Sequence, residues 1–201
     1  THSMHEELVM PDGDLLIHGG DFCRYGDLDE VIHFVNFIKN QPHKFKVIIA
    51  GNHDFPLENK YKAEAENLIL NSGCIYLNDS GVTLEGFNIW GSPVQPEFGG
   101  WAFNRKRGSE IKRHWDLIPE DTDILITHGP PLGILDSIYD SRTVGCKELL
   151  DRVHLVSPKL HVFGHIHESY GLERVGQTLF VNASSVDFAY SSLRDPIVVD
   201  L

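Results

Sequence analysis

Positive charge is scarce in this 201-residue sequence. Its 17 lysines and arginines face 29 aspartates and glutamates, and the formal net charge is -12. No basic cluster is longer than Arg105-Lys106-Arg107, which we interpret as a solvated loop. This balance argues against broad electrostatic binding to nucleic acid or to an anionic membrane.

Cysteine and long apolar runs are also scarce. The sequence has three cysteines, an odd number, which lie far apart at Cys23, Cys74 and Cys146. No Cys-x-x-Cys spacing occurs. Such usage is typical of reduced thiols inside the cell, so we expect a cytoplasmic protein. No apolar run is long enough to cross a bilayer, and we expect no membrane partner. The length fits one domain, over residues 1–201, with a substantial core.

Short apolar runs alternate with amphipathic stretches along most of the chain. We expect helices at residues 27–40, 58–71, 108–115 and 145–154. We expect strands at residues 14–18, 45–50, 75–77, 82–84, 87–90, 123–127, 160–163, 168–174, 178–182 and 197–200. Strands that alternate with helices and then form meanders predict an α/β or mixed α+β fold with two packed sheets.

Polar motifs follow four of the expected strands, where ligands bind in sheets of this kind. The motifs are Gly-Asp ending at Asp21, Gly-Asn-His-Asp at residues 51–54, His-Gly at His128, and Gly-His-x-His at residues 164–167. Each has an ordinary explanation by itself, such as a turn or a chance pair of histidines. Chance readily explains one motif, but not all four in this order.

The side chains in these motifs suit metal chemistry. Asp21 offers a carboxylate able to bridge two cations, and Asn52 offers a neutral oxygen ligand. His53 offers a proton donor, and Asp54 is expected to hold its ring in one tautomer. Mixed imidazole, carboxylate and amide ligands suit Mn²⁺, Fe or Zn²⁺ better than Ca²⁺.

Besides His2, seven of the 12 histidines lie outside these four motifs. We interpret His18 and His161, which lie in or beside strands, as structural. Five more have no motif context and are expected to face solvent: His5, His33, His43, His114 and His154.

The order of the motifs resembles the calcineurin-like metallophosphoesterase superfamily, whose pattern is D-x-H, G-D, G-N-H-[DE], H and G-H-x-H. The resemblance covers essentially the whole chain. Residues 10–14, 49–53, 127–133, 144–146 and 159–164 resemble a subfamily of small metallophosphoesterase-domain proteins related to cyclic-nucleotide phosphodiesterases. The resemblance implies a four-layer sandwich of two sheets flanked by helices.

The resemblance also implies a site with two divalent metal ions, Mn²⁺ first, with Fe or Zn²⁺ as alternatives. His2 and His167 would bind the first ion, Asn52, His128 and His165 the second, and Asp21 would bridge both. His53, paired with Asp54, would protonate the leaving oxygen. Substrate would contact Asn52, His53, His128 and His165. The implied reaction is hydrolysis of phosphodiesters, cyclic nucleotides among them, by a metal-bridging hydroxide with His53 as general acid.

One motif departs from the family pattern. The sequence opens Thr1-His2-Ser3, so the aspartate of Asp-x-His would stand directly before Thr1. We therefore expect a domain without its first core strand and a first metal site weakened by the loss of an anionic ligand. The alternative function is a catalytically weak or inactive metal- and nucleotide-binding module of the same fold.

A segment with aromatic residues is relevant to the choice of substrate. Trp90, Trp101 and Phe103 lie in or near residues 91–108, which are rich in Gly and Pro. This segment either stacks a nucleobase or is a packed surface loop, and the sequence leaves both open. We expect a small phosphoester or nucleotide as the partner and no extended nucleic acid.

Overall fold

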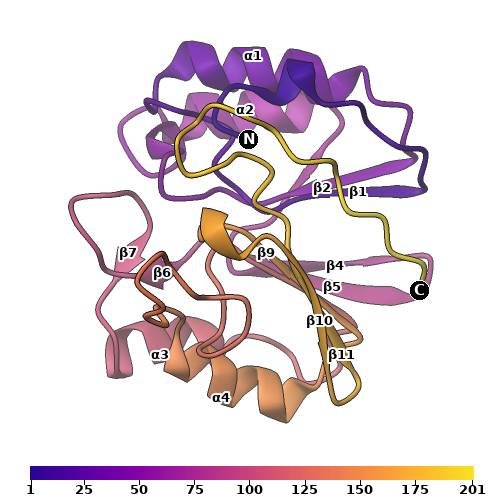
Figure 1. Ribbon diagram of the computed structural model, residues 1–201. Coiled ribbons are helices and arrows are strands. Elements are labelled where there is room, and N and C mark those ends of the chain that lie inside the picture. Colours follow the sequence, from indigo (N-terminus) through magenta and orange to yellow (C-terminus); the bar gives the residue numbers. More distant parts are fainter.

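The computed structural model describes residues 1–201, and two β-sheets form its centre (Figure 1). The smaller sheet is parallel, in the order β1-β2-β3, with β1 at Leu15–His18, β2 at Phe45–Ile48 and β3 at Ile75–Tyr76. The larger sheet is mixed, in the order β10-β11-β9-β8-β5-β4. Its strands are β4 (Ser80–Leu84), β5 (Phe87–Ser92), β8 (Ile124–Thr127), β9 (Leu160–Phe163), β10 (Gly171–Val175) and β11 (Thr178–Asn182).

Helices cover the outer face of each sheet, giving four layers (Figure 1). Helices α1 (Leu28–Lys39) and α2 (Lys62–Asn71) lie on the smaller sheet, and α3 (Ser109–Trp115) and α4 (Lys147–Val156) on the larger one. Three apolar clusters fill the three spaces between the layers. The expected fold class is confirmed. No helix is long and apolar enough to span a bilayer.

Short elements complete the chain. They are the 3-10 helices η1 (His5–Glu7), η2 (Phe55–Leu57) and η3 (His167–Ser169), and the two-stranded pair β6 (Gln95–Pro96) and β7 (Asn104–Arg105). The β6–β7 pair lies between β5 and α3, and the loop that it closes carries Phe98 and Trp101.

Helix α1 shows how the sequence sets an element boundary. Asp27 is the N-cap, as expected, and the Glu30 carboxylate accepts the N–H of Asp27 at 3.1 Å. Val31, Phe34 and Ile38 then recur on one face and are buried against the smaller sheet. Glu30 also accepts the N–H of Arg24 at 2.8 Å, so the cap fixes the loop that precedes the helix.

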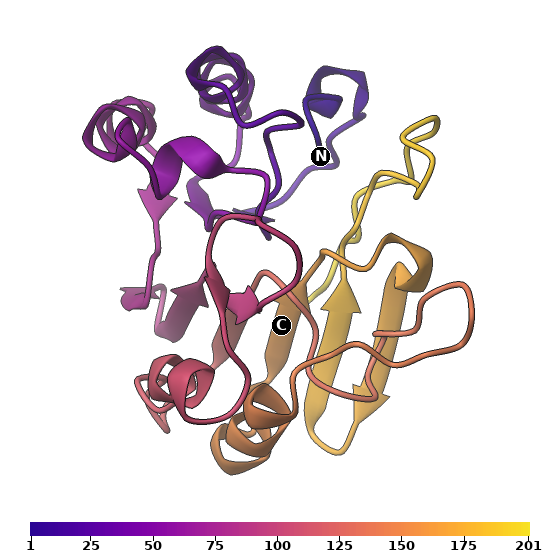
Figure 2. The ribbon, with the colours of Figure 1, turned by 90° about the vertical axis from the view of Figure 1, so that its left-hand side faces the viewer.

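The expected strand at residues 197–200 is wrong. Ile197 and Val199 pack against the apolar cluster between the sheets, but their backbone joins no sheet. A cavity of about 700 Å³ lies between this C-terminal stretch and β1, whose outer edge has no partner strand. Figure 2 shows the C-terminal stretch in yellow, leaving the end of β11. The expectation that the domain lacks its first core strand stays a prediction.

Three of the histidines expected in solvent lie elsewhere. His5 is buried because its ring packs against Phe34 and Phe37, and His43 is buried as well. His114 is half-buried, with Nδ1 2.7 Å from Oδ2 of Asp79. A histidine ring has enough apolar surface to pack in a core when it is neutral or when one of its nitrogens has a hydrogen-bond partner. Sequence context alone does not reveal which histidines are packed in this way.

Candidate metal centre

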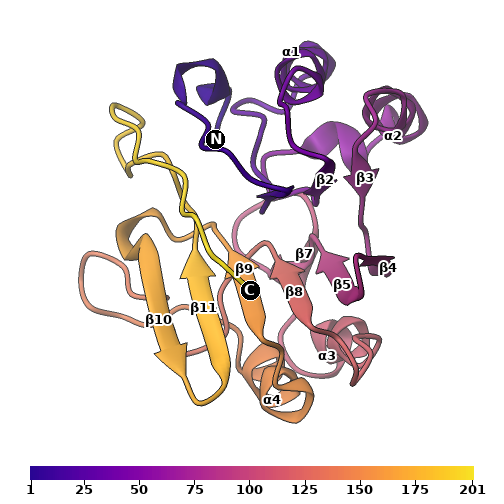
Figure 3. The same cartoon turned by 90° about the vertical axis from the view of Figure 1, so that its right-hand side faces the viewer.

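The loops after four strands meet at one place, and they come from both sheets. β1 and β2 of the smaller sheet lead to the loops of Asp21 and Asn52, while β8 and β9 of the larger sheet lead to His128 and His165. Strands β8 and β9 are parallel neighbours, so their carboxyl ends lie together (Figure 3). The four motifs named from the sequence therefore form one site between the sheets.

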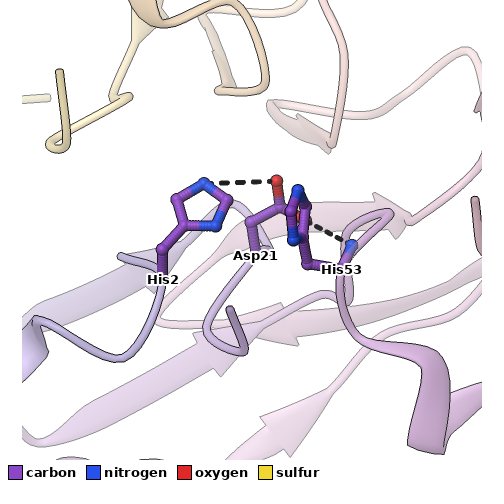
Figure 4. A group of neighbouring side chains, drawn as sticks. All are labelled: His2, Asp21 and His53. Atoms are coloured by element: carbon purple, nitrogen blue, oxygen red, sulfur yellow. Dashed lines mark hydrogen bonds and ion pairs between the residues drawn. The ribbon is translucent and has the colours of Figure 1, made fainter. Parts of the chain in front are cut away.

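Asp21 occupies the middle of this site. Its Oδ2 lies 3.6 Å from Nε2 of His2 and 3.4 Å from Nε2 of His128. Its other oxygen, Oδ1, accepts the backbone N–H of His53 at 2.8 Å (Figure 4). One carboxylate thus faces imidazoles on two sides, which is the position a bridging ligand needs.

Each side of Asp21 has further ligand atoms. On one side, Nε2 of His2 lies 3.1 Å from Nε2 of His167. On the other side, Nε2 of His128 lies 2.9 Å from Oδ1 of Asn52. The ligand atoms of Asp21, His128 and His165 lie within 4.8 Å of one another.

His53 lies close enough to the first side to be a ligand by distance alone. The ligand atoms of His2, Asp21 and His53 lie within 4.8 Å of one another, and the rings of His2 and His53 meet edge to face (Figure 4). Geometry therefore leaves two roles for this imidazole, metal ligand and proton donor.

Main-chain carbonyl groups orient three of the imidazoles through Nδ1. The pairs are His53 with the carbonyl of Arg24 at 2.7 Å, His128 with that of Gly19 at 2.9 Å, and His167 with that of Asp187 at 3.2 Å. A carbonyl oxygen only accepts, so Nδ1 carries the proton in each ring and Nε2 is left for the site.

The predicted pairing of His53 with Asp54 is wrong. The Asp54 carboxylate is fully buried and accepts three backbone N–H groups instead. They come from Asp21 at 2.8 Å, Gly51 at 2.7 Å and Cys23 at 2.9 Å. The side chains of His53 and Asp54 point in different directions. Asp54 therefore joins the loops of Asp21 and Gly51, and the carbonyl of Arg24 orients His53.

The charges in the site suit a cation. Burial opposes ionisation of Asp21, but the nearby imidazoles, His128 first, hold its pKa well below the ordinary value. Burial would lower the pKa of His128 too, yet the charge of Asp21 raises it, so the site favours a positive charge at this point. Burial lowers the pKa of His2, and that of His165 to about 3, which keeps these rings neutral and able to bind metal. This donor set fits two divalent ions that share Asp21.

The backbone at the site is strained. His2, Asp21 and His165 have φ of 47°, 57° and 69°, in the left-handed region that side chains other than glycine rarely adopt. Gly51 is required for close packing, because a Cβ there would lie 2.3 Å from Oδ1 of Asp21 and 2.4 Å from Cε1 of His128.

Three neighbouring residues carry no motif and escaped the sequence analysis. Arg24 acts through its carbonyl, which no side-chain pattern reveals. The Tyr190 ring lies 4.9 Å from that of His2, and Phe98 lies 5.8 Å from His165, both measured between ring centroids.

Of the aromatic residues that the sequence singled out, only Trp101 reaches the site. Its ring centroid lies 4.3 Å from that of His53. Phe103 is buried in the cluster beneath α1 and α2, and Trp90 packs against the cluster beneath α3 and α4. Those two rings serve the core.

The sequence pattern of calcineurin-like phosphoesterases matches residues 3–169 of this chain. The chain belongs to the calcineurin-like phosphoesterase family. Membership agrees with the paired His and Asp ligand groups around Asp21 and implies a phosphoesterase type of hydrolase.

Several known proteins are similar to this calcineurin-like phosphoesterase. It is 46% identical over 225 residues to the human metallophosphoesterase domain-containing protein 1, covering all of this chain and 68% of that protein. It is 40% identical over 220 residues to a Caenorhabditis elegans UPF0046 protein, covering 100% of this chain and 78% of the relative. A solved structure from Thermus thermophilus shares the fold at 15% identity, with a TM-score of 0.58 over 85% of this chain and 76% of that one.

Proposed function

We propose that this chain is a metal-dependent phosphodiesterase for small substrates, with nucleotides and cyclic nucleotides among them. The observation that carries the proposal is the placement of Asp21, whose Oδ2 faces His2 on one side and His128 on the other. A shared carboxylate between two sets of nitrogen and oxygen ligands is the arrangement that a two-metal site requires.

Six residues would hold the ions, with Mn²⁺ favoured and Fe or Zn²⁺ as alternatives. They are His2, Asp21 and His167 for one ion, and Asp21, Asn52, His128 and His165 for the other. Such ions supply an activated water at neutral pH and neutralise the phosphoryl oxygens as charge develops. The chain itself keeps the imidazoles of His2 and His165 neutral by burial and holds Asp21 ionised.

His53 is the proposed general acid. Its Nδ1–H is held by the carbonyl of Arg24, which leaves Nε2 for the site beside Asp21. Protonated His53 would donate from Nε2 to the oxygen that leaves phosphorus. Half-burial leaves this ring reachable by substrate while its partner fixes its direction.

The charge of the chain supports a small substrate. With a net charge of -12, the surface repels a long polyanion beyond the site, while the ions offset charge only locally. A single phosphodiester therefore fits better than an extended nucleic acid.

The test is hydrolysis of an aryl phosphodiester with Mn²⁺ and with a chelator, in the wild type and in His53→Ala. We expect metal-dependent turnover in the wild type and a roughly 10²–10⁴-fold loss in His53→Ala with bound manganese unchanged, because the variant removes a proton donor only. Manganese content is measured by mass spectrometry of the desalted protein. His154→Ala, an exposed histidine on α4, is the matched control.

Two outcomes contradict parts of this proposal. If His53→Ala loses manganese in step with activity, His53 is a ligand and not the acid. If the folded wild type binds manganese and nucleotide but hydrolyses no phosphodiester, the chain is the inactive binding module.

A further inference from the structure

Two aromatic rings of the β6–β7 loop lie over the metal centre. Trp101 contacts His53, with ring centroids 4.3 Å apart, and Phe98 meets His165 edge to face at 5.8 Å. His53 comes from the smaller sheet's loops and His165 from the larger sheet's loops. The aromatic pair therefore borders both halves of the site.

Hydrogen bonds fix this loop to the site. The N–H of Ala102 donates to the carbonyl of the proposed ligand Asn52 at 3.2 Å. The amide of Asn104 donates to the carbonyls of Phe98 at 2.9 Å and Gly99 at 3.3 Å. The aromatic residues are thus held at a set distance from the ligands rather than placed by a loose surface loop.

Exposure and orientation distinguish Phe98 from a core residue. Its side chain is 53% exposed, although it lies next to a buried ligand cluster. Its ring is nearly parallel to that of Trp101, at 19°, with centroids 6.4 Å apart. Beyond its two chain neighbours, a Cβ on Gly100 at the loop tip would meet no atom within 4 Å, so the tip faces open space. A flat group that lies against one of these rings is therefore nearly parallel to the other as well.

We propose that Phe98 and Trp101 form the subsite for the base of a nucleotide whose phosphate lies at the metal centre. The inference rests on the proposed function for the place of the phosphate. A planar base is the occupant because stacking on an aromatic face needs no positive charge, which is scarce in this acidic chain, and because every base has a π-face. The subsite makes the protein select nucleotides over phosphorylated sugars.

The experiment compares two ligands that differ only in the base. Affinities of AMP and ribose 5-phosphate for the Mn²⁺-loaded protein are measured by calorimetry. We expect the wild type to bind AMP at least about tenfold more tightly, as stacking of one base provides. In Phe98→Ala the ratio should fall to within about threefold through weaker AMP binding alone, with the affinity for ribose 5-phosphate unchanged.

Further variants separate the ring from its bulk. Phe98→Leu keeps the apolar volume and should behave like Phe98→Ala, whereas Phe98→Tyr should keep the preference. Tyr61→Ala removes an aromatic residue that is 39% exposed at the start of α2 and should change nothing. Equal wild-type affinities for the two ligands overturn the inference, as does a Phe98→Ala variant that keeps the preference or weakens both ligands equally.

Failure of this inference can be told apart from failure of the proposed function. Hydrolysis of phosphodiesters without any preference for AMP removes the base subsite and leaves the phosphodiesterase. A preference for AMP that depends on Phe98, in a protein without hydrolytic activity, supports the subsite and removes the phosphodiesterase.

Discussion

Replacing Asp54 with asparagine tests whether this buried carboxylate is part of the proton donor or part of the scaffold. One of its oxygens, Oδ2, accepts the N–H groups of Asp21 and Gly51, and Oδ1 accepts that of Cys23. An amide oxygen in the place of Oδ2 keeps the first two bonds. The amide NH₂ then faces the N–H of Cys23, which is buried and loses its acceptor.

The expected loss of stability follows from this count. A hydrogen bond to a charged group contributes about 1.5–3 kcal/mol, and a buried donor without a partner costs a similar amount. Part of that cost is offset, because burial, followed by the charge of Asp21, raises the pKa of Asp54 to about 7 and makes the charged form expensive in this site. We expect the free energy of unfolding to fall by about 2 kcal/mol.

Metal affinity should fall as well, because Asp54 holds the loops of Asp21 and Gly51 in register. Loss of such a supporting contact weakens metal binding by roughly 10–100-fold. Urea unfolding at pH 7 measures the stability, and calorimetric titration with Mn²⁺ measures the affinity.

Asp136 provides the matched control for this experiment. It is buried, and its Oδ2 accepts the N–H groups of Gly133 and Gly145, both at 2.9 Å, neither of which adjoins a proposed ligand in the sequence. Asp136→Asn can keep both bonds and should leave Mn²⁺ affinity unchanged. The scaffold role of Asp54 is refuted if Asp54→Asn keeps the wild-type stability and Mn²⁺ affinity and loses only turnover.

Two further predictions address the site and the core. Gly51→Ala should abolish tight Mn²⁺ binding and lower the unfolding free energy by about 1–3 kcal/mol, since its Cβ collides with Asp21 and His128; unchanged calorimetric affinity would show that the loops can separate freely. His161 is buried in β9, and burial lowers its pKa to about 3. Between pH 6.5 and 3 only the unfolded chain takes up a proton at this residue, so the free energy of unfolding decreases as the pH is lowered through that window. His161→Gln should reduce the slope of unfolding free energy against pH near pH 5 by about 1 kcal/mol per pH unit, and equal slopes in urea titrations of the two proteins would contradict the assigned burial of the neutral ring.

Local patterns predicted most of the regular elements, although β10 begins at Gly171 and α2 at Lys62, three and four residues later than expected. The strands Leu160–Phe163 and Thr178–Asn182 match their expected bounds, because apolar runs end there at glycine or at turn residues. Residues 197–200 have a similar pattern, yet they form no strand. A strand forms only where its backbone can hydrogen-bond to a neighbouring strand. β1 lies across the cavity from these residues and does not pair with them.

The candidate site was predictable in its members but not in its contacts. Motifs after four strands identified Asp21 and its neighbours because the carboxyl ends of neighbouring parallel strands meet at one edge of each sheet, β1 with β2 and β8 with β9. The partner of His53 was missed, since sequence adjacency suggested Asp54 and the acceptor is a carbonyl at Arg24. Phe98 escaped notice for a related reason, because only the fold of the β6–β7 loop places it beside His165.

The left-handed backbone of His2, Asp21 and His165 has a consequence for how this family can change over time. Glycine would fit each of these positions with less backbone strain, by about 1 kcal/mol apiece. Selection for ligand chemistry must therefore continually oppose selection for stability at the same codons. A descendant that no longer binds metal would gain stability from substitutions to glycine at these three positions. The residue types found there therefore indicate whether the metal-binding chemistry is still under selection. In this chain they remain imidazole, carboxylate and imidazole.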